Sequence, residues 1–102
     1  MKYQRSAVFA TDFGHLDVRE RQLFREAVRA INDAHKQARG HWPPAWPAAL
    51  RIRSVTGAPG IWEMTWSFSG PDGRATFEFA SAGGEPAIRW RRIGTHEIFR
   101  EP

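Results

Sequence analysis

The chain has 102 residues, 41% of them hydrophobic, with five Trp, seven Phe and no Cys. This length suits one domain spanning residues 1–102, and the aromatic side chains can fill its core without a disulfide. The lack of Cys excludes thiolate chemistry, and no apolar run approaches the roughly 20 residues that cross a bilayer. The first residues also lack the apolar region of a secretory signal, so we expect a cytoplasmic protein without a membrane partner.

The formal net charge is +4, and all but two of the fifteen basic residues are arginines. A guanidinium group binds phosphate through two parallel hydrogen bonds, so this composition favours an anionic partner. A codon bias toward Arg would produce the same composition. The positions of the arginines along the predicted elements therefore decide between the two interpretations.

The first third of the chain predicts a short strand followed by an amphipathic helix. Residues 3–9 form the strand, and Asp17 with Glu20 has the spacing of a capping box at a helix start. Apolar residues then recur at spacings of three and four as far as Gly40, which is expected to end the helix in the C′ position. These apolar positions are Val18, Leu23, Phe24, Ala27, Val28, Ile31, Ala34 and Ala38. One or two helices fit this region.

The rest of the chain predicts four strands after a stiff connector. Residues 41–49 contain three Pro, which remove backbone donors and favour extended geometry. Apolar and polar residues then alternate with period two, which is typical of a sheet with one covered face and one wet face. The alternating runs, separated by Gly-containing turns, are residues 50–55, 61–68, 74–80 and 87–93.

The alternation divides the strand residues into two faces. The face predicted to be buried carries Trp62, Met64, Trp66, Phe68, Ala75, Phe77, Phe79, Ile88 and Trp90. The opposite face carries Glu63, Thr65, Ser67, Arg74, Thr76, Glu78, Arg89 and Arg91. We therefore predict an α+β fold, in which the N-terminal strand and one or two helices pack on one face of a four- to five-stranded, mainly antiparallel, twisted sheet.

The wet face gathers arginines from separate strands. They are Arg51, Arg53, Arg74, Arg89 and Arg91. Adjacent strands lie about 5 Å apart, so these side chains could surround one anion, and a polyanion would relieve their mutual repulsion. Alternatively, Glu63 and Glu78 neutralise them in cross-strand salt bridges, each of which contributes little. Two carboxylates against five arginines leave a positive excess, which favours phosphate binding.

His96 lies near the end of the last predicted strand, beside the arginines. A single His is most often structural, but here it could protonate a leaving oxygen near neutral pH. His15, His35 and His41 are scattered along the chain, and no spacing supports a metal site. No Gly-rich phosphate loop and no nucleophile elbow is present, so we expect neither a metal nor a cofactor.

The order of elements and several short motifs resemble the RelE/ParE toxin superfamily. These motifs are Leu50-Arg-Ile-Arg53, Gly60-Ile-Trp-Glu-Met-Thr-Trp66 and Gly73-Arg-Ala-Thr-Phe77. The segment Trp90-Arg-Arg-Ile-Gly-Thr-His96 is similar to the YoeB- and HigB-like branch, which has a histidine near the C-terminus. The resemblance implies a RelE/ParE-like domain over residues 1–102. It also implies the toxin of a bacterial type II toxin–antitoxin system, an mRNA interferase that cleaves mRNA on the ribosome without a metal.

The resemblance also implies roles for individual residues. Arg74 would stabilise the phosphate in the transition state, and His96 would be the general acid. The family's acidic general base lies earlier, where this chain reads Pro47-Ala-Ala-Leu50 and has no carboxylate. Glu63 or Glu78 could substitute, and Glu63 is preferred because it lies on the adjoining strand. The residues expected to hold mRNA and ribosomal RNA are Arg51, Arg53, Arg89 and Arg91.

A toxin of this kind implies a cognate antitoxin, whose helix or extended segment covers the basic face or displaces the last strand. Two other functions remain open. The chain could be a non-enzymatic toxin of the gyrase-inhibiting ParE branch, or an inactive nucleic-acid-binding module. The first would damage DNA and leave mRNA intact, whereas the second would bind RNA in a salt-sensitive way without cleaving it.

Overall fold

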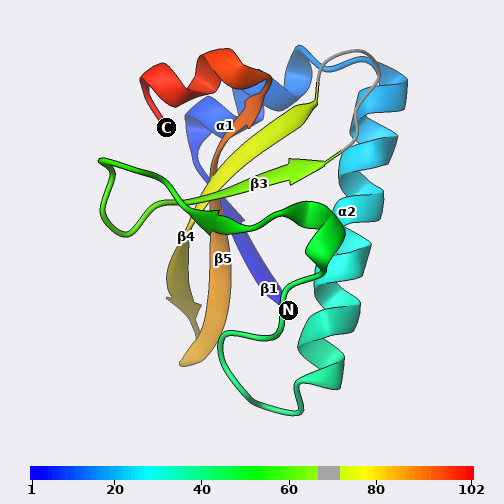
Figure 1. Cartoon of the computed structure of the whole chain (residues 1–102), viewed down its shortest axis with the longest axis vertical. Coiled ribbons are helices and arrows are strands. Elements are labelled where there is room, and N and C mark those ends of the chain that lie inside the picture. The colour runs from blue at the N-terminus through cyan, green and yellow to red at the C-terminus, as the bar shows by residue number, and fades with distance from the viewer. Residues whose placement is uncertain (67–71) are drawn as a thin grey trace.

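A twisted sheet of five strands, with α2 lying along one face, forms the framework of the computed structural model (Figure 1). The structure describes residues 1–66 and 72–102, apart from the side chain of His96. The strands are β1 (Lys2–Arg5), β2 (Arg53–Ser54), β3 (Trp62–Trp66), β4 (Gly73–Ala82) and β5 (Glu85–Gly94). The helical elements are α1 (Ala7–Gly14), α2 (Val18–Gln37) and the 3₁₀ turns η1 (Ala48–Leu50) and η2 (His96–Arg100).

The strand order is β1-β5-β4-β3-β2. β1 runs parallel to β5, and every other neighbouring pair is antiparallel. This arrangement confirms the predicted α+β fold with a mainly antiparallel sheet. No helix among residues 1–66 and 72–102 has both the length and the apolar character needed to cross a membrane.

The chain leaves β1 at Ser6, which begins α1. The Ser6 hydroxyl accepts a hydrogen bond from the Phe9 amide (3.0 Å) and donates one to the Arg91 carbonyl of β5 (2.9 Å). A helix cap therefore replaces the second half of the strand predicted over residues 3–9, which is wrong beyond Arg5. The sequence allowed one or two helices in this region, and the structure has two, α1 and α2.

α2 begins with the predicted capping box. The Asp17 carboxylate accepts from the Glu20 amide (2.7 Å), and the Glu20 carboxylate accepts from the Asp17 amide (2.9 Å). The helix ends earlier than predicted, however. Ala38 is its C-cap, and Arg39, with a positive φ of 49°, takes the C′ position that was predicted for Gly40. Val18 also departs from the prediction, since it is 81% exposed at the start of the helix rather than turned to the core.

The covered face of the sheet holds an aromatic core. Trp90 meets Phe24 at 5.1 Å and Phe77 at 5.4 Å between ring centroids, in both cases edge to face. From the predicted set, the buried residues are Met64, Trp66, Ala75, Phe77, Ile88 and Trp90, whereas Trp62 and Phe79 are partly buried. The prediction for Phe68 lies outside the described residues, as does that for Ser67.

The strand predicted over residues 50–55 is shorter than its alternation indicates. Only Arg53 and Ser54 pair with β3, because Leu50 belongs to η1 and Arg51 takes a left-handed conformation with φ 46°. The last strand ends at Gly94, and the chain then turns into η2. His96, expected near the end of the last strand, therefore lies beyond it and begins a 3₁₀ turn.

A β-bulge interrupts the pairing of β4 with β5. Thr76 pairs with Arg92 and Phe77 pairs with Trp90, so Arg91 is the extra residue. Because of this residue, both arginines of the Trp90-Arg91-Arg92-Ile93 run avoid the core, and Ile93 returns to it. Strict alternation would have placed Arg92 on the apolar face.

Candidate functional site

The face of the sheet opposite α2, here called the open face, carries Arg74 at the start of β4. Arg74 pairs with Thr65 on one side and with Gly94 on the other. Its Nε is buried, and no residue in the described part of the chain accepts a hydrogen bond from it. The guanidinium carbon lies 5.9 Å from the centroid of the Phe99 ring. Such an unsatisfied buried donor marks Arg74 as a candidate functional residue.

Glu63 lies diagonally across from Arg74 on the same face. Its cross-strand partner is Arg53, whose Nε donates to the Glu63 carboxylate at 2.5 Å. The two side chains differ in exposure, 10% for Glu63 and 79% for Arg53. Both residues line a hollow of about 320 Å³ together with Phe99. The Phe99 ring therefore lies beside two of the three predicted catalytic residues, although diagonal neighbours on a sheet are still about 7 Å apart.

His96, the third of these residues, begins the segment 96–102, which we call the C-terminal strap. Its side chain lies outside the described part of the chain. The backbone is positioned by η2, which lies against β4 and β5. Ile98 is buried, and it comes so near to β5 that a Cβ atom at Gly94 would lie 3.0 Å from Ile98 Cγ2. Gly94 thus permits the close approach that brings the strap onto the sheet.

The four arginines predicted to bind RNA are all paired with carboxylates. Glu78 bridges Arg89 at 3.5 Å and Arg91 at 3.4 Å, so it is less available than Glu63 as a base. Arg53 pairs with Glu63, and Arg51 pairs with Asp72 at 3.0 Å. Arg51 lies outside a strand and does not converge with the others. Cross-strand neutralisation, the alternative considered for this face, is therefore present. The partly exposed pairs of Arg51, Arg89 and Arg91 are weak and open to exchange, whereas Arg53 pairs with a buried carboxylate.

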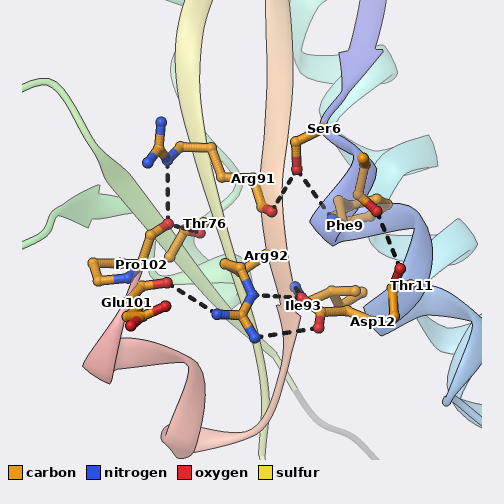
Figure 2. Close-up of polar contacts among 11 residues, drawn as sticks. Ser6, Phe9, Thr11, Asp12, Thr76, Arg91, Arg92, Ile93, Glu101 and Pro102 are labelled. Carbon is orange, nitrogen blue, oxygen red and sulfur yellow. Dashed lines mark hydrogen bonds and ion pairs between the residues drawn. The ribbon is translucent and has the colours of Figure 1, made fainter.

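Sequence reasoning missed an ion pair beside the bulge, between Arg92 and Asp12 of α1. The Asp12 carboxylate accepts from Arg92 Nε at 2.7 Å, from Arg92 Nη2 at 3.2 Å and from the Ile93 amide at 3.1 Å (Figure 2). The hydrogen bond that Arg92 donates to Asp12 raises the pKa of Arg92 above its usual value. The adjacent arginines between Trp90 and Ile93 break the alternation, and this break was the available signal for the bulge.

The strap itself was also missed. Its Pro102 main-chain oxygen accepts from Thr76 Oγ1 at 2.7 Å and from Arg91 Nε at 3.2 Å (Figure 2). The Glu101 carbonyl accepts from Arg92 Nη1 at 3.1 Å. Thr76 is fully buried as a result, although its strand position predicts a wet side chain. The open face is therefore covered along part of β4 and β5.

Comparison with known proteins supports the fold. No family model and no curated protein matches the chain. A chain of the RelB-RelE antitoxin-toxin complex from Methanococcus jannaschii is similar with a TM-score of 0.60 and 12% identity, over 96% of this chain and 95% of that one. A YoeB/ParE toxin from Agrobacterium tumefaciens is similar with a TM-score of 0.52 and 15% identity, over 94% of this chain and 99% of that one. The chain therefore shares the fold of these two solved chains, which is the fold that the sequence resemblance predicted.

Proposed function

We propose that this protein is the toxin of a toxin–antitoxin pair and that it cleaves mRNA on the ribosome as a metal-independent endoribonuclease. The observation that carries the proposal is the state of Arg74, a guanidinium with a buried donor and no acceptor among the described residues. It lies diagonally across from Glu63 on the face opposite the core. A guanidinium of this kind can bind a phosphate group, and a carboxylate on the same face can remove a proton from a hydroxyl close to that phosphate.

In the proposed reaction, a ribose 2′-hydroxyl attacks the adjacent phosphorus in line with the 5′ oxygen of the next nucleotide. Glu63 takes the 2′ proton as the new O–P bond forms, and for this its carboxylate exchanges the hydrogen bond from Arg53 for one from the hydroxyl. Arg74 neutralises the charge that grows on the phosphate oxygens. His96 gives a proton to the 5′ oxygen as its bond to phosphorus breaks, which leaves a 2′,3′-cyclic phosphate and a 5′-hydroxyl.

The remaining arginines are proposed to hold the RNA backbone. Arg89 and Arg91 make partly exposed ion pairs, so a phosphodiester can displace their carboxylate partner at small cost. Arg53 is 79% exposed and can reach a phosphate, although its partner Glu63 is only 10% exposed. Arg51 contributes from the outer edge of the sheet in the same way. These contacts carry no base recognition, and the affinity should fall as the salt concentration rises.

The proposal includes an antitoxin that covers the open face. The M. jannaschii structure is described as an antitoxin-toxin complex, which supports a partner of this kind for a chain of the same fold. An antitoxin bound there would deny mRNA access to Arg74.

The test is mRNA cleavage on translating ribosomes, read by primer extension. Arg74→Ala should lower the cleavage rate about 10²-fold or more, as expected for loss of one transition-state donor, and His96→Gln and Glu63→Gln should also lower it. Arg29→Ala, an equal change at an exposed position of α2, is the matched control and should cut like the wild type. Equal cutting by all five proteins would refute the assigned roles.

The alternative is a toxin that inhibits gyrase without cleaving RNA. It is kept because the A. tumefaciens structure of the same fold is described as a YoeB/ParE toxin. Cells expressing this protein would then show damaged DNA and intact mRNA. Salt-sensitive RNA binding without cleavage or growth arrest would instead indicate an inactive nucleic-acid-binding module.

A further inference from the structure

Three donors on the open face bind main-chain oxygens of the strap. Thr76 Oγ1 and Arg91 Nε both donate to the Pro102 oxygen, and Arg92 Nη1 donates to the Glu101 carbonyl. The donors come from facing positions of β4 and β5, at the bulge that turns both arginines away from the core. One hydroxyl and two guanidinium groups thus converge on neighbouring oxygen atoms (Figure 2).

These donors have the chemistry of a phosphate site. Guanidinium and hydroxyl groups are among the side chains that bind phosphate oxygens of nucleic acids. Arg91 and Arg92 are also paired with the carboxylates of Glu78 and Asp12. The cluster borders a hollow of about 410 Å³ that Arg89 also lines. Asp12 holds Arg92 in position from α1. The site is therefore built and oriented, and the strap fills part of it.

The strap is attached in a way that would let its end leave. Ile98 is buried and anchors the first half, whereas Arg100 and Glu101 are exposed. The Phe99 ring lies 5.9 Å from the guanidinium carbon of Arg74. Residues 100–102 are held through their main-chain atoms, including a hydrogen bond from the Glu101 amide to the Ile98 carbonyl (3.2 Å). Opening at Phe99 would therefore expose the three donors without disturbing the aromatic core.

We propose that Thr76, Arg91 and Arg92 form a subsite for a phosphodiester group of RNA, and that strap residues 100–102 occupy this subsite in the free protein and compete with RNA for it. The ligand's identity rests on the proposed function. The subsite adds Thr76 and Arg92 to the residues that contact RNA, and it makes the strap a built-in competitor for the same donors.

The central experiment removes residues 100–102 and measures binding of a 2′-O-methyl RNA 15-mer by fluorescence anisotropy. This RNA lacks the attacking hydroxyl, so binding is measured without cleavage. The deletion removes one basic and one acidic side chain, so the net charge of the protein is unchanged. Since three hydrogen bonds hold the strap closed, we expect the deleted chain to bind about tenfold more tightly. Unchanged or weaker binding would overturn the competition.

A pair of full-length variants covers the case in which the deletion disturbs folding. Arg100→Gln with Glu101→Gln removes the same side-chain charges but keeps the main-chain acceptors, so its affinity should equal that of the wild type. Arg100→Gly with Glu101→Gly makes the strap more costly to order and should bind RNA about threefold more tightly. Equal affinities of the two double variants would contradict a competing strap.

Thr76→Val tests the subsite itself, because it removes the hydroxyl with little change in shape. In the deleted chain it should weaken RNA binding about fivefold. In the intact chain the change should be much smaller, since the same substitution also loosens the strap. A purely structural role of Thr76 would give the same factor in both chains and would overturn the subsite, as would failure of the deleted chain to bind the RNA.

Cleavage on ribosomes, measured for the same proteins, separates this inference from the proposed function. If wild type and deleted chain both fail to cleave while the binding changes appear, the endoribonuclease proposal falls and the subsite stands. If both chains cleave and bind equally, the subsite occupancy is wrong and the endoribonuclease proposal is untouched.

Discussion

The two faces of the sheet are stabilised by different forces. On the face beneath α2, Phe24, Phe77 and Trp90 pack edge to face in a core that excludes water. On the open face, Ile98 and Phe99 of the strap add some apolar packing. The arginines of this face make ion pairs such as those with Glu78 and hydrogen bonds to main-chain oxygens of the strap. Apolar burial has no substitute in solution, whereas each polar contact can be exchanged for water or for a ligand. Stability and proposed function are therefore divided between the faces.

The largest effect is expected from Phe77→Ala, which empties a fully buried position of the covered face. Loss of a buried Phe side chain costs about 3–5 kcal/mol in the free energy of unfolding. Urea denaturation, followed by tryptophan fluorescence, measures this loss. Phe99→Ala is the matched substitution on the open face, where the ring is only partly buried, and it should cost less than half as much. Equal losses would show that the open face carries as much of the stability as the core.

Asp12 lies between the two faces, and its removal should have the next largest effect. Asp12→Ala leaves the Arg92 guanidinium and the Ile93 amide without their acceptor. Both side chains of the ion pair are largely buried, with 14% of Asp12 and 24% of Arg92 exposed. We expect a loss of about 2–3 kcal/mol, again from urea denaturation. Asp12→Asn keeps one acceptor oxygen and should lose clearly less. If Asn and Ala are equally destabilising, the charge rather than the hydrogen bonds holds the bulge.

The covered face could be predicted because buried positions are occupied by apolar residue types, which can be recognised in the sequence. Phe77 and Trp90 follow the period-two alternation, and the pair of Asp17 and Glu20 marks the start of α2 by residue type. The positions of Arg74 and Glu63 on the opposite face follow from the same alternation. Their proposed roles, by contrast, come from the resemblance and await the cleavage assay.

What could not be predicted depends on geometry that residue types do not encode. The strap binds through the main-chain oxygens of Glu101 and Pro102, and every residue has such an oxygen. The bulge at Arg91 shifts the parity of β5 by one residue, so Arg92 was assigned to neither face. The helix cap at Ser6 was hidden because Ala7, Val8 and Phe9 suit a strand as well as a helix.

The smallest change to stability, with a measurable change in binding, is expected for Glu78→Gln. Glu78 pairs with Arg89 and Arg91 while about a third of its side chain is exposed, so the loss should stay below about 1 kcal/mol. Two freed arginines should bind a 2′-O-methyl RNA more tightly and steepen the fall of log affinity with log salt by about 0.7 for each additional phosphate that they neutralise.

Glu85→Gln changes the net charge equally but releases only Lys2 at the far end of β5. Because it leaves the bridged arginines paired, its salt dependence should match that of the wild type. Equal slopes for the two variants would mean that Arg89 and Arg91 attract RNA only through the overall charge of the protein, and that the open face does not hold RNA at specific positions.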